Sequence, residues 1–161
     1  MYDTDLRSEV SQGDIFQSIR VVRIKYPEMI PVVKDIQGIL LTDDCEYDKK
    51  RSVYVLVCEV RLLAEVSPGS AGNIKNYKTL NTFYLEGNEK FKDSYLDLSL
   101  TYQVEKQFLI DLANKGLRIK SLSDTTRSAL QRQISIYFGY KRNPEAVTET
   151  TSGESVEAVS N

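Results

Sequence analysis

Two apolar runs with a short acidic stretch between them limit the fold of this chain more than any other feature. The first run, residues 38–42, and the second, residues 53–60, are rich in Val, Ile and Leu. Short runs of this kind, bounded by polar residues, predict β-strands. Both faces of each run are largely apolar, which is typical of strands that are covered on both sides. We therefore predict a central antiparallel hairpin of residues 38–45 and 53–60, with its acidic end at the turn.

The remaining pattern predicts a mainly β chain. Further strands are expected at residues 13–16, 19–25, 82–85, 95–100 and 117–122. Helical spacing of apolar residues predicts a short helix within residues 104–114 and a C-terminal amphipathic helix from residue 123 or 124 to residue 138. Prolines and glycines predict loops at residues 27–31 and 67–73. The expected fold is a small twisted β-barrel of five to seven strands with these two peripheral helices.

Composition divides the chain into three parts. Residues 1–12 are polar and predict a flexible lead-in, and residues 13–143 hold the strands and helices of the barrel domain. Residues 144–161 consist mostly of Thr, Ser, Glu, Val and Ala without aromatics, a composition that predicts a disordered tail.

Charge and cysteine content limit the cellular compartment that we expect for this chain and the catalytic groups that it can use. The 161 residues carry a net charge of −2, two cysteines and no histidine. No signal peptide or membrane-length apolar run is visible, so we expect a cytoplasmic protein without membrane contact. In the predicted hairpin Cys58 lies opposite Leu40, about 17 Å from Cys45, which favours two reduced thiols. The absence of histidine excludes histidine bases and histidine metal ligands, and the net charge disfavours a purely electrostatic nucleic-acid binder.

Four short motifs resemble the PemK/MazF-like small β-barrel family of toxin–antitoxin systems. They are Gly13-Asp14-Ile15-Phe16, Gly38-Ile39-Leu40-Leu41-Thr42-Asp43, Tyr54-Val55-Leu56-Val57 and Leu96-Asp97-Leu98, in that order along the chain. The chain also looks like a looser set of bacterial defence and mobile-element proteins. The resemblance implies a small barrel in which Thr42 supplies a catalytic hydroxyl and Arg20 or Arg23 balances the charge of a reacting phosphate.

One departure from the family pattern separates two functional hypotheses. Active members carry an Arg-Pro pair before the second strand, whereas Pro27 and Pro31 of this chain do not follow an arginine. This favours a non-catalytic binding module for a protein partner, a second copy of the chain, or RNA or another single-stranded nucleic acid. The alternative is a toxin-like endoribonuclease that cleaves RNA without a metal. Neither hypothesis needs a cofactor.

The acidic stretch supports a third hypothesis. The carboxylates of Asp43 and Asp44, with Glu59 from the next strand, are oxygen ligands of the kind that divalent cations prefer. A metal-dependent nuclease would use Asp44 and Glu59 to hold such an ion, with Arg61 nearby. The alternative is a solvated turn in which Asp43 or Asp44 accepts hydrogen bonds from turn amides.

Basic residues on two predicted strands form a final candidate site. Arg23 and Lys25 come from one strand, and Arg118 and Lys120 from another. If the two strands are neighbours, these cations could bind phosphates, with tyrosines such as Tyr102 stacking on bases. The alternative is that they are solvated charges on outward-facing strand positions.

Overall fold

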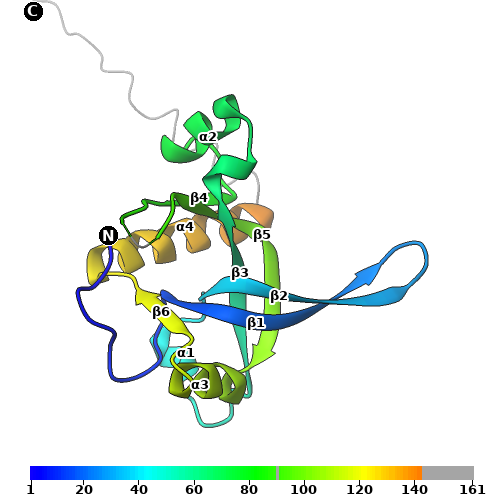
Figure 1. Cartoon of the computed structure of the whole chain (residues 1–161), viewed down its shortest axis with the longest axis vertical. Helices are drawn as coiled ribbons and strands as arrows, with labels where there is room; N and C mark the ends of the chain where they lie inside the picture. Colours follow the sequence, from blue (N-terminus) through cyan, green and yellow to red (C-terminus); the bar gives the residue numbers. More distant parts are fainter. Residues whose placement is uncertain (90, 143–161) are drawn as a thin grey trace, which may run out of the picture.

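The computed structural model describes residues 1–89 and 91–142, which contain six antiparallel strands in one sheet, ordered β4-β5-β3-β2-β1-β6 (Figure 1). The strands are β1 (Asp14–Lys25), β2 (Ile30–Leu40), β3 (Tyr54–Leu62), β4 (Thr82–Leu85), β5 (Ser94–Glu105) and β6 (Arg118–Ser121). The helices are α1 (Asp44–Tyr47), α2 (Pro68–Lys75), α3 (Lys106–Asn114) and α4 (Asp124–Arg142), with a 3₁₀ turn η1 (Leu63–Glu65).

The predicted central pairing is present. Strands β2 and β3 pair antiparallel from Gly38↔Glu59 to Leu40↔Val57, so Cys58 lies opposite Ile39, one residue from the predicted position. Cys58 is buried, Cys45 is exposed in α1, and both thiols are free, as expected. The acidic end of the hairpin is the short helix α1 rather than a simple turn.

Both sides of this central pair are covered. One core packs under α4 and contains Ile15, Ile39, Cys58, Leu96, Leu98 and Leu130. The other packs under α3 and contains Phe16, Ile19, Ile36, Leu40, Val57 and Leu109. Because successive side chains of a strand point to opposite faces, neighbours such as Ile39 and Leu40 supply different cores. This double cover explains why both faces of the two runs are largely apolar.

The mainly β class with peripheral helices is confirmed, but the sheet is open and does not close into the expected barrel. The β1–β2 hairpin pairs with β3 over only three residue pairs and then crosses β3 and β5 steeply (Figure 1). Gly38 stands at this crossing, where a Cβ would lie 2.8 Å from Cδ1 of Ile19. The same Cβ would lie 3.3 Å from the carbonyl oxygen of Cys58, so a larger residue would crowd both β1 and the contact between β2 and β3.

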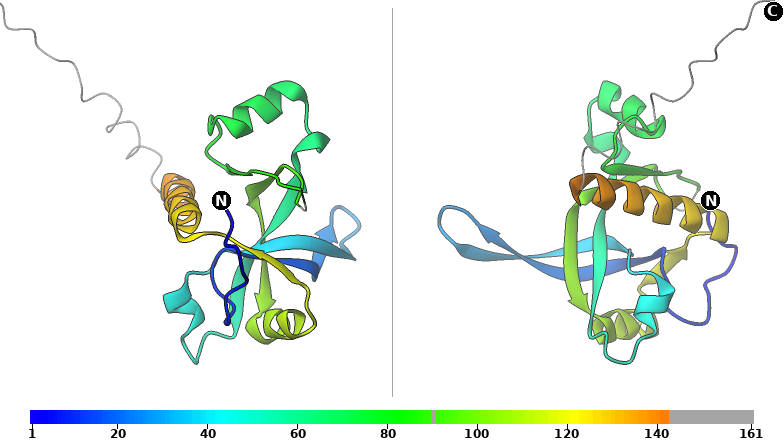
Figure 2. Two further views of the ribbon diagram at one scale, coloured as in Figure 1. Left: turned by 60° about the vertical axis from the view of Figure 1, so that its left-hand side comes forward. Right: turned by 180° about the vertical axis from the view of Figure 1, so that it is seen from behind.

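The distal part of the β1–β2 hairpin, residues 20–35, projects from the body and is called the arm (Figures 1 and 2). Its strands stay paired as far as Lys25↔Ile30, so the predicted loop at residues 27–31 is a tight tip followed at once by β2. Pro31 pairs with Ile24 inside the ladder. The arm has little cover of its own, and many of its apolar side chains are exposed.

One predicted loop is a helix. Residues 67–73 were expected to be irregular, but most of them form α2. Ser67 caps this helix by accepting a hydrogen bond from the amide of Ser70 at 3.4 Å, and Pro68 occupies the first turn, where its missing N–H costs nothing.

Two predictions about strand bounds need correction: the strands predicted at residues 13–16 and 19–25 are the single strand β1, and the first strand of the central hairpin is β2 at Ile30–Leu40 instead of residues 38–45. The elements β3, β4, β6, α3 and α4 lie close to their expected bounds. Strand β5 is longer than predicted and continues directly into α3. In the lead-in, Tyr2 forms a β-bridge with Leu122, whereas the predicted tail, residues 144–161, lies outside the described residues. None of the helices in the described part of the chain has the length and apolar character needed to cross a membrane.

Candidate functional site

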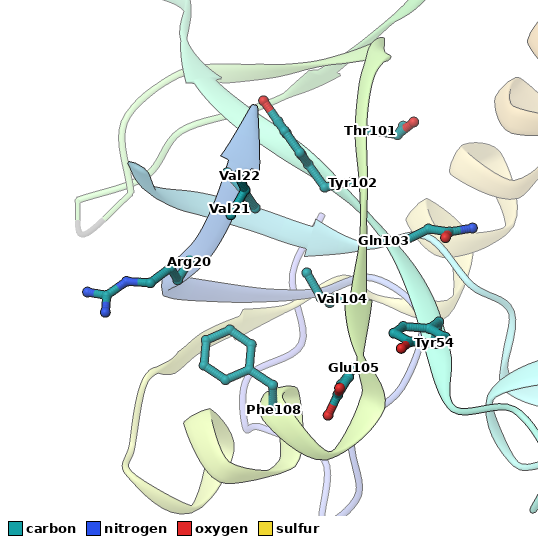
Figure 3. A pocket seen from close by; sticks show the side chains of 10 residues that line it. All are labelled: Arg20, Val21, Val22, Tyr54, Thr101, Tyr102, Gln103, Val104, Glu105 and Phe108. Carbon is teal, nitrogen blue, oxygen red and sulfur yellow. The ribbon is translucent and has the colours of Figure 1, made fainter. Parts of the chain in front are cut away.

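A groove of about 740 Å³ separates the root of the arm from β5 (Figure 3). Its lining comes from β1, the start of β3, the second half of β5 and the first turn of α3: Arg20, Val21, Val22, Tyr54, Thr101, Tyr102, Gln103, Val104, Glu105 and Phe108. Figure 3 shows Tyr102 and Val104 pointing toward the arm, whereas Thr101 and Gln103 point away. The groove therefore has an apolar inner side and a polar outer side.

A polar cluster holds the arm over the body beside this groove. Both carboxylate oxygens of Glu59, on β3, accept hydrogen bonds from Nζ of Lys34 at 2.8 Å. Nη2 of Arg23 lies 3.7 Å from Glu59, and the Tyr102 hydroxyl donates to the same carboxylate at 3.4 Å. The Arg23 guanidinium also sits 5.2 Å from the centre of the Tyr102 ring, within cation–π range. Glu59 thus joins the two arm strands to β3 and β5.

The cluster sets the electrostatics of Tyr102. Burial raises the pKa of its hydroxyl, and the nearby Arg23 cation opposes that rise. The phenol is consequently neutral at physiological pH and acts as a hydrogen-bond donor to Glu59. The Glu59 carboxylate already contacts two cations and a phenol, and it therefore anchors the arm to the body.

One face of the arm carries an exposed apolar strip, which meets the groove at Val22. Val22 pairs with Val33, and Ile24 pairs with Pro31, so these four side chains share one face. Val22, Ile24 and Val33 are 57%, 57% and 58% exposed. Toward the tip, Tyr26, Met29, Ile30 and Val32 are also exposed. This is the largest run of exposed apolar side chains on one element in the described part of the chain.

The predicted catalytic residues do not meet. The Thr42 hydroxyl accepts a hydrogen bond from the amide of Leu56 at 2.8 Å. Arg20 forms an exposed ion pair with Asp35 at 2.9 Å. Arg23 lies beside Glu59, and Glu59 pairs in register with Gly38. Gly38 is four residues, or about 13 Å of extended chain, from Thr42.

The predicted metal ligands are also separated. Asp43 accepts a hydrogen bond from the Glu46 amide as the cap of α1. Asp44 accepts from the Gln12 amide and from Arg127, both at 2.7 Å, while Glu59 is held by Lys34. Among the residues that the structure describes, no group of three or more acidic or cysteine side chains could hold a metal ion.

The predicted basic face divides into two sets. Arg23 and Lys25 lie on the arm, whereas Arg118 pairs in register with Phe16 near the start of β1. Arg118 is almost buried and forms an ion pair with the fully buried Asp14 at 2.9 Å, and Lys120 lies over the ring of Tyr2. These two β6 cations therefore have structural partners. On the arm, Arg23 lies over the ring of the groove residue Tyr102, whereas Lys25 pairs with Glu28 near the tip.

Sequence reasoning missed Lys34 and the joining role of Glu59. Lys34 stands two residues before the buried Ile36 on the same face of β2, and this spacing places it on the side that faces β3. This position identifies Lys34 as a partner of Glu59 only when the steep crossing of the β1–β2 hairpin over β3 and β5 is known.

Comparison with known proteins adds no assignment. No protein-family model matches the chain, and no curated protein is detectably similar to it.

Proposed function

We propose that this chain is a non-catalytic binding module that docks a protein partner on its arm. The observation that carries the proposal is the exposed apolar strip on a projecting hairpin. A two-stranded ribbon is marginally stable in water, and contiguous exposed apolar surface on such an element is typical of an interface. The Glu59 cluster holds the arm in position before binding, which lowers the entropy that docking has to overcome.

Charge indicates the kind of partner surface. The arm carries Arg20, Arg23, Lys25 and Lys34 against Glu28 and Asp35, whereas the whole chain has a net charge of −2. A partner with an apolar groove and an acidic rim would match both features, since interfaces combine an apolar centre with a charged, complementary edge.

The biological setting is proposed from the sequence. The resemblance to PemK/MazF-like proteins supports a partner within a toxin–antitoxin or related bacterial defence system. The two free thiols support a reducing compartment such as the cytoplasm.

Site-specific photo-cross-linking tests the proposal. A photoreactive residue replaces Val33 on the arm or, as a control, the exposed Gln131 on α4, in the cells that make this protein. The expected result is one protein cross-linked through the arm position and not through α4. That protein is then purified, and its affinity for the wild-type chain is measured.

The matched variants are Ile24→Ser with Val33→Ser on the arm, and Leu6→Ser with Leu80→Ser elsewhere on the surface. All four residues are exposed apolar side chains, so neither pair should disturb the fold. Burying two such side chains contributes about 2 kcal/mol, so the arm pair should weaken binding about 30-fold. Equal effects of the two pairs would reject the arm as the docking surface.

A second candidate function is binding of single-stranded RNA. The specific observation is the Arg23–Tyr102 contact beside Lys34, because cations and aromatic rings together are the usual platform for single strands. It predicts binding of a labelled oligonucleotide that weakens with salt and is lost in Arg23→Gln. A ribonuclease would cleave the RNA without a metal ion, and Thr42→Ala would abolish this cleavage. A metal nuclease would cleave only with Mg²⁺ or Mn²⁺, and Asp44→Asn would abolish that cleavage.

A further inference from the structure

The groove is lined by the edges of two strands rather than by their faces. Residues 101–105 of β5 and residues 20–22 of β1 line it consecutively. Side chains alternate between the two faces of a strand, so a surface formed by five consecutive residues follows the backbone edge. The groove thus lies along the edge of β5, with a short stretch of β1 as its opposite wall (Figure 3).

Strand pairing leaves this edge of β5 open. Strand β3 covers the other side of residues 101–105, and β4 pairs only from Thr82↔Asp97 to Leu85↔Ser94. Across the described residues, no backbone hydrogen bond joins the outer side of residues 101–105 to another strand. Their outward N–H and C=O groups therefore point into the groove or into water.

The exposed edge has none of the usual protection against pairing. Its sequence, Thr101-Tyr102-Gln103-Val104-Glu105, contains no proline and no lysine, and it ends in a single charge. Natural edge strands are commonly blocked by proline, lysine or a covering element. An open, unblocked edge inside a groove is a template for one more strand.

We propose that an extended segment of the partner protein adds to the sheet here, pairing with residues 101–105 of β5. This deepens the proposed function and depends on it only in taking the partner to be a protein. Main-chain hydrogen bonds to the edge would provide the affinity, and alternate side chains would provide the specificity. About five residues, or about 17 Å of extended chain, would fill the edge.

The walls of the groove define the chemistry of this segment. Tyr102, Val104 and Phe108 offer an apolar inner surface to every second side chain. The Arg20 guanidinium lines the groove and is 68% exposed, and its surface ion pair with Asp35 is weak enough for an acidic side chain of the segment to compete for the cation. The segment is therefore expected to alternate apolar with polar residues and to carry at least one Asp or Glu.

The experiment uses a displayed library of random 12-residue peptides selected against the folded full chain. The enriched peptides are expected to alternate as described, and one is synthesised for anisotropy and for amide exchange measured by NMR. Binding should slow exchange about tenfold or more at every second amide of residues 101–105. N-methylation of alternate peptide amides should weaken binding at least 30-fold, whereas methylation of the intervening amides should change it less than threefold.

Side-chain variants provide the controls. Arg20→Gln should weaken an acidic peptide about fivefold, whereas Gln131→Ala, at an exposed position of α4 outside the groove, should leave its affinity within twofold. Selection of no peptide, protection mapped away from β5, or indifference to N-methylation would overturn the proposal. So would protection of the same amides in a dimer of the free chain, or competition by single-stranded RNA alone.

Docking on the arm and strand addition at β5 can be tested independently of each other. Ile24 and Val33 lie outside the groove lining, so Ile24→Ser with Val33→Ser should weaken docking on the arm about 30-fold and leave peptide addition unchanged. If that pair leaves docking intact while the edge still binds peptide, the arm proposal is wrong and strand addition stands.

Discussion

The β1–β2 hairpin has two halves that differ in how far other elements cover their apolar side chains. At its root, Ile19 pairs with Ile36, and these side chains are 0% and 5% exposed under α3. In the arm, Ile30 and Val32 lie on the same face of β2 as Ile36, but they are 53% and 44% exposed. The two strands stay paired through both halves, with one register shift between Phe16 and Ile19 in the root. What differs is that α3 buries the root, whereas under the proposed function a docked partner would cover the arm.

The largest contrast is expected in thiol reactivity. Burial and the nearby Asp97 raise the pKa of the Cys58 thiol far above its usual range, and its side chain is fully buried. Its modification requires local unfolding, so a maleimide should react with Cys58 at least about 1,000-fold more slowly than with the exposed Cys45. A cysteine introduced by Ile24→Cys should react as fast as Cys45. Mass spectrometry over time measures all three rates, and a slow arm thiol would mean that the arm is covered in the free protein.

Removal of the buried carboxylate in the body should cost the most stability. Asp14 is fully buried and accepts hydrogen bonds from Arg118 at 2.9 Å and from the Ser121 hydroxyl at 2.6 Å. Asp14→Ala leaves the Arg118 charge buried without its partner, which costs about 3–5 kcal/mol. The matched arm variant, Asp35→Ala, breaks an exposed pair with Arg20 and should leave the urea midpoint unchanged. Equal losses would contradict the division into body and arm.

An isoleucine can be truncated to alanine in each half of the hairpin. Ile36→Ala creates a cavity under α3 and should lower the free energy of unfolding by about 2–4 kcal/mol. Ile24→Ala removes a side chain that is 57% exposed, so its effect should stay within about 0.5 kcal/mol. Urea unfolding of the two variants measures the difference directly. A large loss for Ile24→Ala would show that the arm packs against something within the same molecule.

The smallest predicted effect is a pH-dependent loss of stability at Asp93, a half-exposed residue of the body. Lys75, the Gly87 amide and the Tyr84 hydroxyl donate to Asp93 and lower its pKa to about 2. An acid with a lowered pKa stabilises the fold above its unfolded pKa of about 3.9, and this contribution disappears as the pH falls toward 2. Because solvent screens the site, Asp93→Asn should cost only about 1 kcal/mol at pH 7 and less at pH 2.5. A cost that is the same at both pH values would mean that packing, and not charge, holds the loop.

The sequence predicted the parts of the fold that local chemistry decides. Alternating or continuous β-branched residues located β3, β4 and β6, and helical spacing before Lys115-Gly116 located α3. The helix α2 was missed because Pro68, Gly69 and Ser70 suggest a loop by composition, although a serine cap followed by proline is also a helix start.

The candidate site depended on contacts between distant residues. Arg23 and Glu59 were both singled out from the sequence, but for separate sites. Their pairing requires the steep crossing at Gly38, which no local pattern encodes. The openness of β5 was equally invisible, because it results from β4 being shorter than the strand that it pairs with.

The attachment of the arm has a consequence for how such a protein can change. The root of the β1–β2 hairpin shares a core with β3 and β5, whereas the arm is tied to them mainly through the Glu59 cluster. Two residues added to each strand at the tip would preserve the alternation of side chains and leave every interior contact intact. The reach of the arm can therefore be changed between relatives or by engineering while the folding unit stays the same.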